Sequence, residues 1–206
     1  MSPKRQRSGR SNGGEGEGPA RDGGASGRGT RNGAAAHAAG RPDVAALERF
    51  LRSLGLDPRR DPEYMETAEL AAGLLAERTV GLREEIRPLR TARYKGRPGE
   101  AVALEEIPVY CLCPHHLVPY FGEAQVRYVP RSKVAGPSSI ARLVRDLALT
   151  PRIQENLTQA IADQLERALE PGSVEVTVRA RHLCAEMRGT EQRVQFVTEA
   201  RRAGRA

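Results

Sequence analysis

Residues 174–181 alternate strictly between apolar and polar side chains. The apolar residues are valine or alanine, and the polar ones are Glu175, Thr177, Arg179 and Arg181. A period of two puts all the apolar side chains on one face, which predicts a β-strand that packs one face against a core. The predicted strand ends at His182-Leu183-Cys184, so a histidine and a cysteine follow it directly.

Other stretches predict partner strands. Residues 124–128 place alanine, valine and tyrosine on one face, with glutamine and arginine on the other. Residues 102–112 also read as a strand, with a break at Pro108. Between them lies Cys113-Pro114-His115-His116, so we expect a strand pair with this Cys/His stretch at or near the turn. A further strand is predicted at about 193–198.

Four stretches have apolar residues at helical spacing: about 44–54, 67–78, 140–147 and 150–169. Asp43 is the predicted N-cap of the first helix, and Thr150 followed by Pro151 predicts the start of the fourth. Three leucines of the second helix are expected to face inward: Leu70, Leu74 and Leu75. Residues 80–100 and 130–136 are expected to be irregular connections, with some helix near 82–86 as an alternative for part of the first. The order of elements predicts an α+β fold of antiparallel strands with helices inserted between strand pairs.

The net charge of +7 is concentrated at the start of the chain. Residues 1–41 carry eight Lys/Arg against three acidic residues, and about half of the 21 glycines. Few apolar residues offset the chain entropy there, so we predict a disordered tail, a folded region at 42–200 and a polar end at 201–206. Within the folded region, we expect N-terminal helices at 42–80 and an α+β part at 100–200 that contains all three cysteines.

The sequence shows no secretory signal and no stretch of roughly 20 apolar residues that could cross a membrane. All three cysteines and three of the four histidines fall in two short segments. Such use of cysteine fits a reducing cytosol better than a disulfide framework, so we expect a cytoplasmic protein.

Cys113 and His116 have Cys-x-x-His spacing, which lets one loop present a sulfur and an imidazole nitrogen to one metal ion. Cys184 supplies a third soft ligand. Two cysteines and one histidine with the fourth position left to water form a catalytic rather than a structural zinc arrangement. Cys111 is a candidate fourth ligand; alternatively, Cys111 and Cys184 are small buried hydrophobic residues. Spacing alone leaves both interpretations open.

His115 and His182 remain as candidates for proton transfer, since an imidazole has an unperturbed pKa of about 6.5. The alternative is that both are ordinary hydrogen-bonded histidines. Arg188 is a candidate for binding an anionic group with two parallel hydrogen bonds, or is a solvated surface arginine.

Taken together, these motifs resemble the GTP cyclohydrolase I family over about residues 43–198. The resemblance rests on five segments: Leu112-Cys113-Pro114-His115-His116-Leu117-Val118-Pro119, Gly122-Glu123-Ala124, Tyr128-Val129-Pro130, Ile153-Gln154-Glu155-Asn156-Leu157-Thr158, and His182-Leu183-Cys184 followed by Arg188-Gly189.

The resemblance implies the tunnelling fold, an antiparallel sheet with helices packed on one face, whose strands join a barrel shared by several subunits. It further implies a homo-oligomer, typically a decamer, with active sites at subunit interfaces. The implied reaction converts GTP to 7,8-dihydroneopterin triphosphate and formate, the first step of tetrahydrofolate and pterin biosynthesis.

The resemblance also implies roles for individual residues. Zn²⁺ would be bound by Cys113, His116 and Cys184, and protons would be transferred by His115 and His182. The guanine edge would be held by Glu155 with Gln154, and the ribose and triphosphate would be contacted by Ser138, Arg142 and Arg188.

The sequence departs from the family pattern at several positions. Pro114 stands where an acidic residue is common, and Ser139 where the family often has a phosphate-binding lysine. The last strand lacks the usual Ser/Thr-rich run. These departures concern the phosphate end of the nucleotide more than the zinc site.

Three alternatives stay open from the sequence. The chain could be a divergent paralogue that acts on another guanine nucleotide. It could be a non-enzymatic zinc protein whose basic tail binds nucleic acid, although the folded region shows no basic stripe and nucleic acid is the less favoured partner. It could also be a related pterin-fold enzyme in which Cys113 is a nucleophile rather than a metal ligand.

Overall fold

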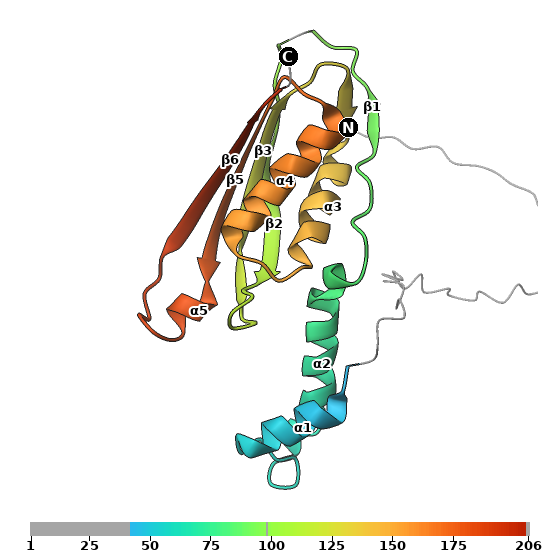
Figure 1. Ribbon diagram of the computed structural model, residues 1–206. Coiled ribbons are helices and arrows are strands. Elements are labelled where there is room, and N and C mark those ends of the chain that lie inside the picture. The colour runs from blue at the N-terminus through green and yellow to red at the C-terminus, as the bar shows by residue number, and fades with distance from the viewer. Residues whose placement is uncertain (1–41, 98, 205–206) are drawn as a thin grey trace, which may run out of the picture. The chain divides into compact units, whose positions relative to one another are not determined.

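A computed structural model describes residues 42–97 and 99–204 of the chain. The predicted disordered tail, residues 1–41, lies outside them. The described residues form a four-stranded antiparallel sheet of order β2-β3-β5-β6 and a two-stranded antiparallel sheet of β1 and β4, with helices between the strands (Figure 1). The α+β class predicted from the sequence is confirmed, and this arrangement is consistent with a tunnelling fold.

The large sheet consists of β2 (Val102–Leu112), β3 (Pro119–Val129), β5 (Ser173–His182) and β6 (Gln195–Ala203). The register shift in β2 lies between Leu104 and Ile107, where Glu106 has a positive φ of 55°, and not at Pro108 as predicted. Pro108 is tolerated within β2 because β2 is an edge strand of this sheet, where one side of the backbone needs no donor.

Strand β6 is longer than the predicted strand at 193–198 and includes residues 201–203. Two short strands were missed altogether. They are β1 (Thr91–Arg93) and β4 (Lys133–Ala135), which pair with each other inside segments expected to be irregular. Each spans three residues, too few for an alternating pattern to be visible in the sequence.

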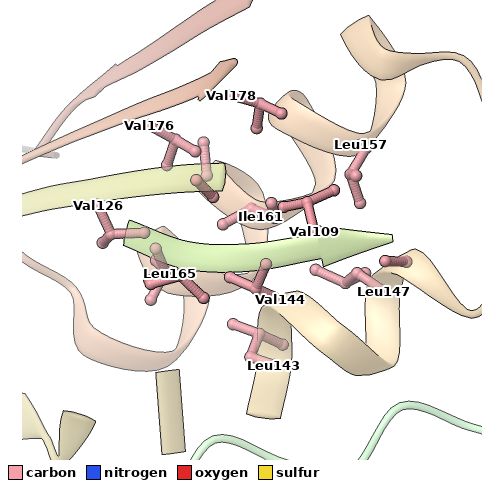
Figure 2. Close-up of a cluster of buried hydrophobic side chains, with 14 of the residues drawn as sticks. Val109, Val126, Leu143, Val144, Leu147, Leu157, Ile161, Leu165, Val176 and Val178 are labelled. Carbon is pink, nitrogen blue, oxygen red and sulfur yellow. The ribbon is translucent and has the colours of Figure 1, made fainter. Parts of the chain in front are cut away.

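Helices α3 (Pro137–Ala148) and α4 (Gln154–Leu169) pack on one face of the large sheet, as predicted (Figure 1). Figure 2 shows the core between these layers, where side chains of both helices meet alternating residues of the strands. Each fully buried Val, Leu or Ile side chain contributes about 1.5–3 kcal/mol by leaving water. The most deeply buried members include Val109, Val126, Val176, Leu157, Ile161 and Leu165.

Helix α4 begins at Gln154, so the prediction that Thr150 and Pro151 start it is wrong. The segment before it is held by the sheet instead. The backbone N–H of Arg152 donates to the carbonyl oxygen of Leu112 at 3.2 Å, at the end of β2. Ile153 is the N-cap residue, with extended φ and ψ angles. This backbone pairing outweighs the local capping signal and brings the start of α4 beside the end of β2.

Helices α1 (Val44–Ser53) and α2 (Thr67–Arg78) match their predicted ranges, and the Asp43 side chain caps α1 by accepting from the Ala46 N–H at 2.9 Å. The expected inward orientation of Leu70 and Leu74 is wrong, because they are 67% and 55% exposed. Helix α2 instead turns a side containing Ala72 and Leu75 toward α1.

Short 3₁₀ helices, η1 (Pro62–Tyr64) and η2 (Val80–Leu82), flank α2, and α5 (Leu183–Glu186) follows β5. Among the described residues, every helix is too short or too polar to serve as a membrane span.

Candidate metal centre and active site

Residues 113–118 form the turn that joins β2 to β3, where the sequence predicted it. The Leu117 N–H donates to the Cys113 carbonyl at 2.9 Å, and the Cys113 N–H donates to the Val118 carbonyl at 3.0 Å. The first of these bonds closes a single helical turn, and Leu117 ends it in the left-handed region at φ 52°. Residues three apart lie on one side of such a turn, so Cys113 and His116 point to the same place.

Strand β5 brings Cys184 to this turn. It runs antiparallel to β3 with His182 opposite Tyr120, so it ends beside the start of β3 and the short helix α5 begins there. The ligand atoms of Cys113, His116 and Cys184 all lie within 4.8 Å of one another, and we call these three residues the Cys/His group. The Cys113 Sγ and His116 Nδ1 atoms are 3.8 Å apart.

The donor set and its spacing fit a tetrahedral zinc ion. Zinc bonds of about 2.3 Å to sulfur and 2.1 Å to nitrogen separate two ligand atoms by roughly 3.6 Å. Cys113 is buried, Cys184 is half-buried and His116 is exposed, so the group opens toward solvent on the histidine side. Three protein ligands with one open side are the arrangement of a catalytic rather than a structural zinc site.

His115 lies next to this group without belonging to it. Its Nδ1 atom is 3.7 Å from the Cys113 Sγ, and its ring meets the ring of His116 edge to face at 6.2 Å. Among the described residues, the group whose ligand atoms are all mutually close contains His116 and not His115. His115 is exposed, and Nε2 is the ring nitrogen that does not face Cys113.

Cys111 is not part of the group. Its side chain is 1% exposed, and its Sγ lies 3.5 Å from the Thr150 carbonyl oxygen. Burial raises the pKa of the Cys111 thiol. This placement fits the small buried hydrophobic residue that the sequence left open as one of two interpretations.

The Cys184 thiol has a raised pKa because of burial first and of the neighbouring Cys113 second, while Arg188 acts in the opposite direction. Two adjacent thiols cannot both ionise easily without a positive charge between them. A divalent cation supplies that charge, so the electrostatics of the pair suit a metal ion.

His182 is held on three sides. Its ring stacks on Tyr120 with centroids 4.7 Å apart and an interplanar angle of 10°, and it meets Phe196 edge to face at 5.6 Å. Its Nε2 atom lies 2.8 Å from Oε1 of Gln154. Burial lowers the pKa of His182, and Glu155 and Glu186 oppose this shift. The ring is therefore fixed in position, with Nδ1 as its remaining nitrogen.

Gln154 is 1% exposed, and its amide is occupied inside the protein. Its Nε2 donates to the carbonyl oxygens of Val178 at 3.0 Å and Phe196 at 3.1 Å, and to the hydroxyl of Thr198 at 3.1 Å. The side chain thus links α4 to both β5 and β6 and ends on His182. Sequence reasoning assigned it to the guanine edge and missed this contact.

The hydroxyls of Thr158 and Thr198 complete this network, and they too were missed from the sequence. Thr158 Oγ1 donates to the Gln154 carbonyl at 2.9 Å, so its own oxygen accepts from Thr198 Oγ1 at 2.6 Å. A threonine at position 158, on an otherwise apolar face of α4, was the only signal in the sequence.

The Tyr120 hydroxyl, near Cys111, is buried without a well-formed hydrogen bond among the described residues.

The remaining predicted residues fall into two places. Glu155 and Arg188 are exposed. Glu155 follows Gln154, which contacts His182, and Arg188 lies four residues after Cys184. The charge of Glu155 raises the pKa of His182, and that of Arg188 lowers the pKa of Cys184. Ser138 and Arg142 lie in the first two turns of α3, which begins after the opposite end of β3 from the turn at 113–118. Arg142 donates to the Pro88 carbonyl at 3.0 Å, and Ser138 is exposed.

An open hollow of about 490 Å³ lies on the sheet face away from α3 and α4. It is lined by outward-facing side chains that include Tyr110, Phe121 and Arg181. The residues of the Cys/His group do not line it, so we place the candidate active site at the turn and not in this hollow.

Comparison with known proteins decides the family. The model of the GTP cyclohydrolase I family matches residues 44–205. The chain belongs to the GTP cyclohydrolase I family. The resemblance noted in the sequence is thereby confirmed. The match covers all described helices and strands of the chain, including the turn at 113–118, β5 and α5.

Curated members of the GTP cyclohydrolase I family are similar over most of their length. GTP cyclohydrolase 1 of Geobacillus kaustophilus (strain HTA426) is 40% identical over 148 residues, which is 71% of this chain and 78% of the relative. That of Aquifex aeolicus (strain VF5) is 40% identical over 149 residues, 70% and 76% respectively. That of Thermobifida fusca (strain YX) is 39% identical over 149 residues, 71% and 72%.

A solved structure, the archaeosine synthase QueF-Like in the apo form, overlaps 52% of this chain and 96% of its own. Its sequence identity is 19% and the TM-score is 0.38, so we base no conclusion on it.

Proposed function

We propose that this chain is a zinc-dependent enzyme that opens the imidazole ring of GTP at C8, releases formate and yields 7,8-dihydroneopterin triphosphate. Family membership supports GTP as the substrate. The single observation that carries the zinc-dependent chemistry is the close group of Cys113, His116 and Cys184 beside a buried, hydrogen-bonded His182. In this proposal the product enters tetrahydrofolate and pterin biosynthesis.

The residues present fit a zinc ion, which Cys113, His116 and Cys184 would hold. A zinc ion with an open coordination position supplies Lewis acidity and a nucleophile at neutral pH. The chain itself supplies the proton transfers. His182, whose Nε2 is engaged by Gln154, would accept or donate a proton at Nδ1. His115, exposed beside the group, would transfer the second proton to a ring nitrogen or the leaving formate.

Substrate recognition would begin with Glu155. Its carboxylate is exposed in the first turn of α4 and acts on the pKa of His182, so it lies near the proposed reacting atoms. A carboxylate accepts two parallel hydrogen bonds from the N1 and N2 edge of guanine, which distinguishes guanine from adenine. Gln154 would contribute indirectly, because its side chain holds His182 in place. Arg188, exposed just past Cys184, would bind phosphate oxygens.

Ser138 and Arg142 would complete the phosphate end from a second copy of the chain. Within one chain they lie at the other end of β3 from the Cys/His group. A homo-oligomer with active sites between subunits, a decamer by family resemblance, would bring the two ends together. The exposed apolar side chains of Phe50, Leu70 and Leu74 support such an assembly.

Both edges of the sheet, β2 and β6, could pair with strands of other subunits to form the shared barrel. Location in the cytoplasm also stays a prediction, supported by three free cysteines that a reducing compartment would preserve.

The test measures metal content together with turnover. The purified full-length chain is analysed for bound metal, and formate release and pterin fluorescence are followed with GTP, GDP and GMP. We expect about one zinc per chain and turnover of GTP. Product from GDP or GMP alone would instead identify a divergent paralogue. Absence of product from all three with zinc-loaded protein would contradict the enzymatic proposal.

Cys113→Ala tests the site itself, with Cys111→Ala as the matched control because both cysteines are buried and two residues apart. Loss of zinc and activity is expected for Cys113→Ala only. A Cys113→Ala variant that keeps metal and activity would refute the ligand assignment. A variant that keeps metal but loses activity would favour a nucleophilic cysteine.

A further inference from the structure

Arg181 and Glu186 form a bidentate ion pair across the segment that carries Cys184. Arg181 Nε donates to one carboxylate oxygen of Glu186 at 2.8 Å, and Nη2 donates to the other. The Glu186 side chain is 12% exposed, although it belongs to a helical turn that buries none of its residues fully. We propose that this pair positions Cys184 for metal binding, an inference that rests on the metal centre proposed above.

Arg181 is a fixed anchor. It is the last outward-facing residue of β5 before His182, and the backbone pairs it with Phe121 on one side and Gln195 on the other. Its guanidinium lies 5.6 Å above the ring of Phe121, a cation–π arrangement that further restricts the side chain. The arginine therefore holds its position on the sheet before any contact with Glu186 is counted.

The other contacts of the segment it anchors are weaker: Cys184 packs partly buried against the core, and the Thr190 hydroxyl donates to the Ala185 carbonyl at 3.5 Å. Helix α5, Leu183–Glu186, buries none of its residues fully. Its own backbone supplies one closing bond, from the Met187 N–H to the Leu183 carbonyl at 3.0 Å. A short turn of this kind is marginal without outside contacts. The two parallel hydrogen bonds to Glu186 tie the end of this turn back to the sheet.

The geometry explains why this matters for Cys184. The ion pair joins residues on either side of Cys184 in the chain, so it closes a small loop that includes Cys184. The Cys184 Sγ must stay within 4.8 Å of the ligand atoms of Cys113 and His116, which come from a different turn. Groups that orient ligands without touching the metal commonly change metal affinity or activity 10- to 100-fold when removed.

The two single variants remove different shares of this contact. Glu186→Gln keeps a side chain of the same size with one oxygen that can still accept a hydrogen bond from Arg181, whereas Arg181→Met removes both donors. We therefore expect loss of Arg181 to weaken metal binding more than loss of the Glu186 charge.

The experiment measures zinc affinity of the full-length chain by competition with a chromophoric chelator, for wild type, Glu186→Gln, Arg181→Met and the exchanged pair R181E/E186R. Glu199→Gln is the matched control, because that carboxylate also contacts an arginine, Arg201 at 3.8 Å, but is exposed on β6. Zinc dissociation constants are expected to rise roughly 10-fold or more for Glu186→Gln, further for Arg181→Met, and to recover in the exchanged pair. Glu199→Gln is expected to match wild type.

Cobalt substitution gives a readout that a purely structural role would not change. The thiolate-to-cobalt absorption counts cysteine ligands, with Cys184→Ser as the standard for one lost thiolate. Both single variants are expected to approach that standard, while circular dichroism of the apo chain stays as in wild type. Unchanged affinity and spectra in both single variants, or equal loss in singles and exchanged pair, would overturn the inference. A wild-type chain that binds no metal would overturn the metal centre and the inference together.

Discussion

The Nε2 atom of His182 lies 2.8 Å from the Oε1 atom of Gln154, and this contact defines the protonation pattern of the histidine. The amide nitrogen of Gln154 faces the carbonyl oxygens of Val178 and Phe196, which can only accept. The amide oxygen must therefore face His182 as an acceptor. It follows that Nε2 of His182 carries a proton and that Nδ1 is the basic nitrogen of the neutral ring.

Gln154→Leu is expected to lower the kcat for GTP roughly 10-fold or more while zinc content stays at the wild-type level, because the ring of His182 loses its partner. Steady-state pterin fluorescence and metal analysis check this. Gln159→Leu, an exposed position in the same helix, is the control. If Gln154 contacted guanine directly, KM would rise with kcat unchanged, so the split between kcat and KM separates the two roles.

Asp146 offers a test of what holds α3 to the chain before it. Arg87 donates to this 9% exposed aspartate from Nε at 3.0 Å and from Nη2 at 2.9 Å. Asp146→Asn is expected to reduce the free energy of unfolding by about 1.5–3 kcal/mol, the usual range for hydrogen bonds to a charged group. Urea unfolding at one fixed protein concentration measures it.

The comparison variant is Asp163→Asn. Asp163 also accepts from an arginine, Arg202 at 2.8 Å, but its side chain is 43% exposed. Solvent screens such a pair, so a loss of less than about 1 kcal/mol is expected. Equal losses in the two variants would show that burial of Asp146 does not set the strength of its ion pair.

Asp57 is expected to make the stability of the folded state depend on pH in the acid range. The side-chain hydrogen bond from Arg59 is the main reason that the pKa of Asp57 falls from 3.8 to about 2. A carboxyl whose pKa is lower in the folded state stabilises that state above pH 3.8, and the contribution is lost as pH falls through about 2. NMR titration of the carboxyl carbon should show the low value in wild type. Arg59→Met should return it toward 3.8, whereas Arg60→Met should not.

The sequence predicts those parts of the fold whose pattern repeats several times. Residues 174–181 show their strand directly, and the α2 range is matched at both ends. The start of α4 could not be predicted, because the capping signal at Thr150 competes with a backbone hydrogen bond from Arg152 to β2 that only the tertiary structure reveals. Strong local signals fail where a distant strand offers the backbone a better partner.

The candidate site, like the fold, could be predicted from the sequence only in part. Cys113 and His116 share a turn, so their spacing in the sequence already predicted that both side chains face the same side. The link from Gln154 to His182 joins α4 to the end of β5, and no local pattern encodes it. Ser138 and Arg142 lie away from the group in one chain because β3 separates them, and no local pattern in the sequence indicates that separation.

Cys111→Ser tests the boundary of the metal centre. The Cys111 Sγ faces the carbonyl oxygens of Thr150 at 3.5 Å and Arg152 at 4.0 Å, so a serine hydroxyl placed there can donate to a carbonyl already present. We therefore expect wild-type zinc content, wild-type zinc affinity and a change in unfolding free energy of less than about 1.5 kcal/mol. Cys184→Ser, measured in parallel, should lose zinc affinity strongly because serine is a poor zinc ligand. Zinc affinity that falls as much in Cys111→Ser as in Cys184→Ser would show that the site has a fourth protein ligand. Such a site would be a closed structural zinc site and not a catalytic one with an open position.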